Sequence, residues 1–125
     1  MPYTKNEDST KYWSSRQEGY IAKITGGYVQ PASGAGKFKK CDVIVDGRLL
    51  IEAKTATTEK QQFTIKKEWL SKLKNEVIMS HKDDGFLAFN FGGENGNNYF
   101  VLNEQQFIEY LQYLRGDALN NYGKS

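Results

Sequence analysis

This 125-residue sequence has a single cysteine, a single histidine, two prolines and no long hydrophobic run. One cysteine, Cys41, cannot form an intramolecular disulfide, so we expect the reducing cytoplasm as its compartment. One histidine, His81, is too few for sites in which two or more histidines bind a metal, such as the HExxH type. No apolar run approaches the roughly 20 residues that a bilayer span needs, so we expect no membrane partner.

Length and composition indicate one globular domain. Hydrophobic residues make up 38% and charged residues 26% of the chain, which is ordinary for a folded soluble protein. The polar segment 1–12 is predicted to be a flexible arm, and the polar segment 117–125 a C-terminal tail. The domain itself is therefore expected to span residues 13–116.

The net charge of +2 is unevenly distributed along the chain. Residues 34–74 contain ten Lys or Arg against five Asp or Glu, whereas residues 75–125 contain three against seven. A basic middle section indicates a polyanionic partner such as nucleic acid, because phosphate neutralisation dominates non-specific binding. A solvated lysine-rich surface is the alternative interpretation.

Hydrophobic periodicity, turn residues and caps predict three helices and five strands. The helices are expected from Ser15 to the Gly26-Gly27 stop, over Lys66–Ser80, and after the N-cap Asn103. The strands are expected over Tyr28–Gln30, Cys41–Val45, Arg48–Thr55, Phe86–Phe91 and Tyr99–Leu102. The order helix, three strands, helix, two strands, helix predicts an α/β fold with a central mixed β-sheet flanked by helices.

Charged side chains on an otherwise apolar strand are the most informative feature. Glu52 and Lys54 are two residues apart, so their side chains leave the same face of the strand. Charged groups are rarely buried unless they are paired or bind a metal. Asp42, on the preceding strand, joins them only if the hairpin between the two strands has the right register.

The hairpin turn at Asp46-Gly47 leaves two registers open. A two-residue loop would pair Asp42 with Ile51 and place the two carboxylates on opposite faces. A three-residue loop, Val45-Asp46-Gly47, would pair Asp42 with Leu50 and place both carboxylates on one face. The second register also leaves a wholly apolar opposite face, so we favour it. That face comprises Cys41, Val43, Leu49, Ile51 and Ala53.

Two carboxylates close together, with a lysine beside them, suit phosphodiester hydrolysis. Oxygen ligands prefer hard divalent cations such as Mg²⁺, for which we expect Mn²⁺ to substitute. Asp42 and Glu52 are predicted to bind the metal, with the Ala53 backbone carbonyl as a further ligand. The metal would acidify a water and neutralise charge on the scissile phosphate. Lys54 would orient that water or stabilise the pentavalent phosphorus, and no nucleotide cofactor is expected.

The spacing of these residues resembles a known signature. Asp42, separated by nine residues from Glu52-x-Lys54 across a hairpin, is similar to the motif of the PD-(D/E)xK nuclease superfamily. The proline of that motif is absent here, since Lys40 or Cys41 occupies its place.

The surrounding elements resemble a narrower family. A first helix with Glu18, a small-residue loop at Ser33–Gly36 and a basic approach to Asp42 are similar to Holliday-junction resolvases of the archaeal type and their phage-encoded relatives, over residues 14–114. The resemblance implies a restriction-endonuclease-like fold, a metal and catalytic role for Glu18, and a place for Ser33 near the scissile phosphate. It also implies a homodimer whose two sites cut opposed strands of a four-way junction, in the cytoplasm of a host cell if the chain is phage-encoded.

Several lysines near the motif are predicted to contact DNA phosphates. With Ser33, the predicted DNA-binding residues are Lys37, Lys39, Lys40, Lys66 and Lys67. The sequence contains no helix-turn-helix or zinc module, so we expect recognition of DNA shape rather than of base sequence.

Alternatives stay open at this point. Ser15 and Glu18 have the spacing of a capping box, which would explain Glu18 without a metal. A nuclease of the same fold could cut duplex, flap or mismatch DNA instead of a junction. A non-catalytic DNA-binding module is a third possibility.

Overall fold

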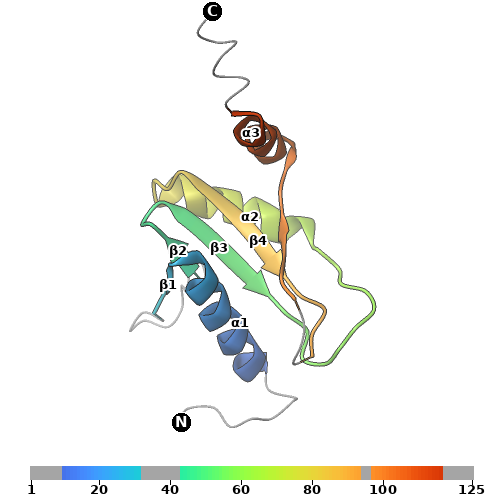
Figure 1. Ribbon diagram of the computed structural model, residues 1–125. Helices are drawn as coiled ribbons and strands as arrows, with labels where there is room; N and C mark the ends of the chain where they lie inside the picture. Colours follow the sequence, from blue (N-terminus) through green and yellow to red (C-terminus); the bar gives the residue numbers. More distant parts are fainter. Residues whose placement is uncertain (1–9, 32–42, 94–96, 117–125) are drawn as a thin grey trace, which may run out of the picture.

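The computed structural model describes residues 10–31, 43–93 and 97–116 (Figure 1). Its helices are α1 (Thr10–Thr25), α2 (Lys67–Met79) and α3 (Glu104–Leu114). Its strands are β1 (Tyr28–Val29), β2 (Val43–Val45), β3 (Leu49–Lys54), β4 (Asp84–Phe89) and β5 (Tyr99–Val101). The described residues form an α/β fold with one open five-stranded sheet, as expected.

The sheet is mixed, with strands in the order β1-β2-β3-β4-β5. The pairs β1–β2, β2–β3 and β4–β5 are antiparallel, whereas β3 and β4 are parallel over six residues. Parallel neighbours need a long crossover connection, and α2 provides it between β3 and β4.

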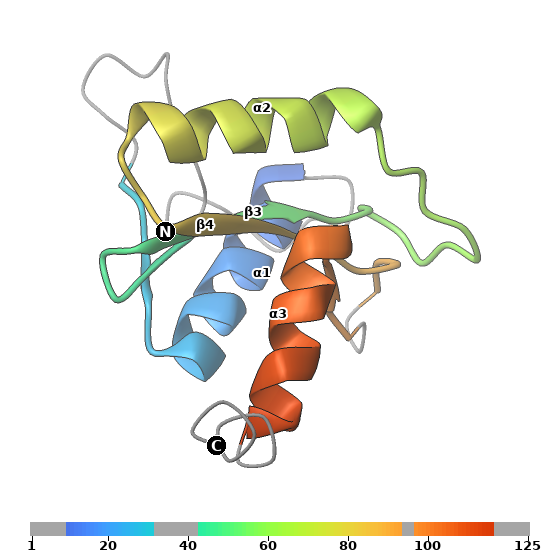
Figure 2. The ribbon, with the colours of Figure 1, turned by 90° about the horizontal axis from the view of Figure 1, so that it is seen from above.

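The central strands are covered by a helix on each face (Figure 2). On one face, Ile21 of α1 packs with Val43, Ile51 and Ala88, and Leu49 and Ala53 lie against this cluster. On the other face, the residues packed together are Leu50, Leu73 and Leu87, with Ile44, Ile65, Trp69, Val77 and Val101 around them. Of the apolar face predicted for the hairpin, the described members Val43, Leu49, Ile51 and Ala53 do lie on one side.

The hairpin between β2 and β3 has a three-residue loop, Asp46-Gly47-Arg48. An odd loop was expected, but its predicted composition was wrong by one residue, and Leu50 pairs with Ile44 rather than with Asp42. Asp46 and Gly47 both have positive φ, at 56° and 66°, which is the conformation that an Asp-Gly turn favours. Keeping Val45 in the strand buries it in the core, whereas Arg48 in the loop stays exposed.

The first helix begins earlier than predicted. It starts at Thr10, so Ser15 lies inside α1 and cannot be its N-cap, and the predicted capping box with Glu18 is wrong. The additional turn buries Trp13, which is spaced four residues from Gln17 and eight from Ile21 on the same helical face. Residues 10–12 therefore belong to the helix and not to a flexible arm.

Where they fall on described residues, the remaining predicted boundaries differ from the observed ones by at most two residues; the predicted strand start at Cys41 lies outside them. Lys66 and Ser80 are the N-cap and C-cap of α2, and Asn103 forms a complete capping box with Gln106 at the start of α3. β4 begins and ends two residues before the prediction, because its parallel register with β3 runs from Asp84 to Phe89. Within the described ranges no helix has the length and apolarity to cross a membrane.

Candidate active site

Glu52 and Lys54 form the centre of the candidate site, near the C-terminal end of β3. Their side chains leave the sheet face that α2 covers, and Lys54 Nζ lies 3.4 Å from Glu52 Oε2. The Glu52 side chain is only 14% exposed and that of Lys54 31% exposed. An ion pair in this setting is held in place by its surroundings and still open to a ligand on one side.

Trp69 of α2 covers the lysine. The ammonium of Lys54 lies 4.6 Å from the centre of the Trp69 ring, and the ammonium of Lys66 lies 5.8 Å from the same centre. Such cation–π contacts are worth about 0.5–1 kcal/mol at exposed sites and more where water is excluded. From the sequence, Trp69 was expected only on the apolar face of the helix. Its position next to Lys54 depends on the packing of α2 on β3.

An aromatic cluster lies next to Trp69 at this end of the sheet. Phe63 stacks on Phe89 with ring centres 5.1 Å apart, and Phe89 stacks on Tyr99 at 5.6 Å. Phe91 meets both Phe89 and Tyr99 edge-on. These contacts tie the loop before α2 to β4 and β5, so the end of the sheet that carries Lys54 is rigidly supported.

The backbone of Lys54 is held by a buried polar cluster that the sequence did not reveal. The Lys54 carbonyl accepts hydrogen bonds from Gln17 Nε2 at 2.8 Å and from the Asn90 backbone N–H at 3.3 Å. Asn98 Oδ1 accepts from Gln17 Nε2 at 3.0 Å and from Asn90 Nδ2 at 3.2 Å. Thr55 donates to Asn90 Oδ1, which also accepts from the Gly92 N–H. The cluster fixes the direction in which β3 presents its last side chains.

Gln17 has one further property. Its Oε1 is, among the described residues, the one buried side-chain nitrogen or oxygen without a hydrogen-bond partner. A buried acceptor left without a donor costs about 1–3 kcal/mol, so it is a polar atom kept free at a cost in stability. Gln17 could have been noticed in the sequence as a polar residue on the apolar face of the first helix.

Glu18 follows Gln17 on α1 and is only 6% exposed. Because the capping box is absent, helix capping no longer explains this carboxylate. α1 packs on the sheet face of Ile51 and Ala53, whereas Glu52 and Lys54 alternate onto the other face. Glu18 and Glu52 therefore approach β3 from opposite sides.

Other predicted site residues fall into two groups. Asp42, Ser33, Lys37, Lys39 and Lys40 lie outside the described residues. Lys66 and Lys67, at the start of α2, are exposed but separate: Lys66 faces the Trp69 ring with Lys54, whereas Lys67 lines a groove on the far side of the helix. Only Lys66 is thus brought to the site.

A metal would depend on Glu52 and on Asp42. Within residues 10–31, 43–93 and 97–116, no group of three His, Cys, Asp or Glu side chains could hold a metal ion together. Glu52 contributes hard oxygen donors beside a cation, which is compatible with Mg²⁺. Ala53 lies in register with Ala88 of β4, and its side chain packs toward α1.

Comparison of the chain with protein-family models, with curated proteins and with solved structures finds no match.

Proposed function

We propose that this protein is a metal-dependent DNA endonuclease with a restriction-endonuclease-like core, which cuts four-way junctions as a homodimer. The observation that carries the proposal is the partly buried Glu52–Lys54 pair at the end of a central strand. Carboxylate and ammonium side chains are seldom placed there unless they are paired or bind a ligand, and here a cluster of buried amides supports the strand that carries them.

Chain connectivity supports a place for Asp42 beside this pair. Val43 and Ile51 are paired, and Asp42 and Glu52 are their covalent neighbours. Because consecutive Cα atoms are about 3.8 Å apart, the chain keeps Asp42 within one residue of this pair. Asp42 and Glu52 would together hold Mg²⁺, with Mn²⁺ as a substitute and the Ala53 carbonyl as a further candidate ligand. When bound, the metal would supply a water of lowered pKa and a Lewis acid for the phosphate.

The chain's own cations complete the chemistry. Lys54 stays close to the carboxylate because Glu52 and the Trp69 ring both hold its ammonium. From there it can hydrogen-bond the attacking water or a phosphate oxygen, and its charge opposes the charge that develops at phosphorus. Lys66, over the same ring, adds a second positive charge for the DNA backbone. In this proposal Ser33, Lys37, Lys39 and Lys40 keep the DNA contacts expected from the sequence. Glu18, on the helix that covers the opposite face of β3, and Lys67, in the groove beside α2, are left out of it.

The proposal is tested by cleavage of a synthetic four-way junction, a linear duplex and a flap. We expect junction cutting with Mg²⁺ or Mn²⁺, none with EDTA, and at least about a 100-fold loss in Glu52→Gln. The matched control is Glu59→Gln, an exposed glutamate in the loop after β3, which should cut like the unaltered protein.

Each contrary result has a distinct meaning. Cutting that ignores EDTA or survives Glu52→Gln would contradict the metal site. Equal cutting of the linear duplex would leave the chemistry standing and remove junction selectivity. Binding of all three substrates without cutting would favour a non-catalytic DNA-binding module.

A further inference from the structure

Helix α3 is the least packed element among the described residues. It contains no buried residue, and none of its Cα atoms lies within 8 Å of a Cα atom of another described helix or strand. Figure 1 shows it at the top of the view, away from α1. It is attached at its first turn, where Gln106 Nε2 donates to Asp84 Oδ1 and to the Gly85 carbonyl.

The helix nevertheless has a continuous apolar face. Phe107, Tyr110, Leu111 and Leu114 follow the spacing i, i+3, i+4, i+7, which aligns their side chains. Phe107, Tyr110 and Leu114 are 48%, 49% and 58% exposed. A helix of 11 residues is marginally stable alone in water, so a face of this kind implies a packing partner.

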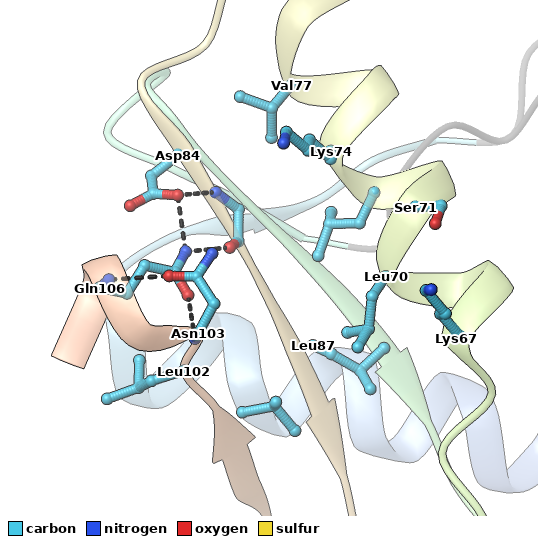
Figure 3. Close-up of a pocket in the computed structure, with 13 residues that line it drawn as sticks. Lys67, Leu70, Ser71, Lys74, Val77, Asp84, Leu87, Leu102, Asn103 and Gln106 are labelled. Carbon is cyan, nitrogen blue, oxygen red and sulfur yellow. Dashed lines mark hydrogen bonds between the residues drawn. The ribbon is translucent and has the colours of Figure 1, made fainter.

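A groove lies directly beside the start of α3 (Figure 3). It has a volume of about 460 Å³ and lies between α2 and the first turn of α3, with β4 as its floor. Its apolar lining comes from Leu70, Leu73, Val77, Leu87, Val101 and Leu102. α2 approaches the floor closely because Gly85 has no Cβ, which would otherwise lie 2.7 Å from Val77 Cγ2.

Charge favours a helix of this same sequence as the occupant. Lys67 and Lys74 line the groove on the α2 side, and the acidic lining residue Asp84 already accepts a hydrogen bond from Gln106. α3 contains two acidic residues and no basic one, and Glu104 flanks the apolar face one turn before Phe107. Residues 75–125 carry a net charge of −4, opposite to the +5 of residues 34–74.

Exposed aromatic side chains alone supply a large part of the area that a stable dimer buries. β5 and α3 carry five aromatic side chains that are 41–79% exposed: Tyr99, Phe100, Phe107, Tyr110 and Tyr113. With about 150–250 Å² per aromatic side chain, they expose roughly 400–700 Å² before any aliphatic side chain is counted. A stable interface buries about 800 Å² per partner.

We propose that α3 of one copy lies in the α2–α3 groove of a second copy, and that the exchange is reciprocal. The first turn of α3 borders the groove, so the helix and the groove are neighbouring surfaces that one two-fold axis can pair reciprocally. This interface gives the homodimer of the proposed function its surface, but it is derived from α3 and the groove and does not depend on nuclease activity.

The first experiment measures mass by light scattering without DNA and with EDTA. We expect a dimer, and a dissociation constant raised about tenfold or more by Phe107→Glu. The matched control is Tyr20→Glu on α1, where the side chain is 55% exposed, and which should leave the dimer intact. Far-UV circular dichroism checks that both variants fold. A monomer for the unaltered chain, or an unchanged dimer for folded Phe107→Glu, would overturn the inference.

Cysteine cross-linking tests where α3 binds on the second copy. In a Cys41→Ser background, copies with Leu111→Cys are mixed with differently tagged copies with Leu70→Cys and oxidised. We expect a disulfide between unlike copies and little between two Leu111→Cys copies. If disulfides form only between two Leu111→Cys copies, the α3 helices pair with each other. That result would contradict the groove as the binding site of α3.

Charge reversal provides an independent check. Lys74→Glu and Glu104→Lys should each weaken the dimer, and the double variant should recover part of the loss. If the double variant is weaker than both single ones, the proposed charge pairing is wrong. Since mass is measured without substrate or metal, failure of this interface and failure of the nuclease proposal remain distinguishable, because Glu52→Gln should still form the dimer.

Discussion

The two ends of this molecule differ in how they use polar and apolar side chains. At the end of β3, charged and amide groups are enclosed: Gln17 and Glu18 are buried, and Glu52 is nearly so. In α3, aromatic and aliphatic groups are turned to solvent, and the helix contains no buried residue. Each arrangement costs free energy in the isolated chain, either through desolvation or through exposed apolar surface.

The contrast indicates that the two regions suit different kinds of ligand. Enclosed polar groups around a strand end suit a small, charged ligand such as a metal ion and a phosphate. An exposed apolar helix beside an apolar groove suits another protein surface. The two regions are therefore interpreted as a site for chemistry and a site for assembly, and changes to one should leave the other measurably intact.

The largest expected effect separates the two regions by activity. Lys54→Met retains an unbranched apolar stem for Trp69 but removes the charge, so cleavage should fall about 100-fold or more. Dimer mass should not change. Tyr113→Ser, on α3, should not reduce the rate at which the protein cuts one DNA strand. A Lys54→Met protein that cuts normally would remove Lys54 from the proposed site.

A stability comparison should give the next largest effect. Ile21 is completely buried against the sheet, so Ile21→Ala should lower the free energy of unfolding by about 2–5 kcal/mol in urea titrations. Ile108 on α3 is 42% exposed, and Ile108→Ala should cost about 0.5 kcal/mol or less in dilute, monomeric protein. Equal losses at low protein concentration would contradict the claim that α3 is unpacked within one copy.

Two glutamines provide a finer comparison. Gln17→Ala removes partly buried bonds to the Lys54 carbonyl and to Asn98 but also the unpaired Oε1, so the net cost should be about 1–2 kcal/mol. Gln106→Ala removes bonds to Asp84 and Gly85 in a more open place, and should cost about 0.5–1.5 kcal/mol. Chemical denaturation measures both. Cleavage should fall in Gln17→Ala alone, since only Gln17 holds the backbone of Lys54.

The smallest effect is expected at the hairpin turn. Arg48 Nε lies 2.6 Å from Asp83 Oδ2, but the two side chains are 70% and 52% exposed. Solvent screens such a pair, so Arg48→Ala should change the free energy of unfolding by about 0–1 kcal/mol. Thermal melts at low and high salt measure it. A larger loss would mean that the turn contributes to the register of β2 and β3 through this ion pair.

Much of the architecture was predictable because it depends on local patterns. Asp46-Gly47 marked the hairpin, Asn103 marked the start of α3, and the apolar spacing of Lys66–Ser80 marked α2. The start of α1 was missed, because a capping signal at Ser15 is weaker than the burial of Trp13 two residues earlier. Burial depends on the facing sheet, which local sequence does not contain.

Only part of the candidate site was predictable from the sequence. Glu52 and Lys54 were found by their two-residue spacing on a strand, and their contact follows from strand geometry. Trp69, Gln17, Asn90 and Asn98 were not found, because they come from four separate parts of the chain. No spacing rule connects residues that meet only after β3 and β4 pair.

The place of the hairpin turn and the shared face of Glu52 and Lys54 follow from the sequence alone, because turns and strand alternation are properties of neighbouring residues. The tertiary structure decided the rest. It placed Trp69 over Lys54, enclosed the carbonyl of Lys54 in a cluster of amides, and left the apolar face of α3 without cover beside a groove. These features depend on how distant elements pack, and packing is set by the whole chain rather than by any one segment.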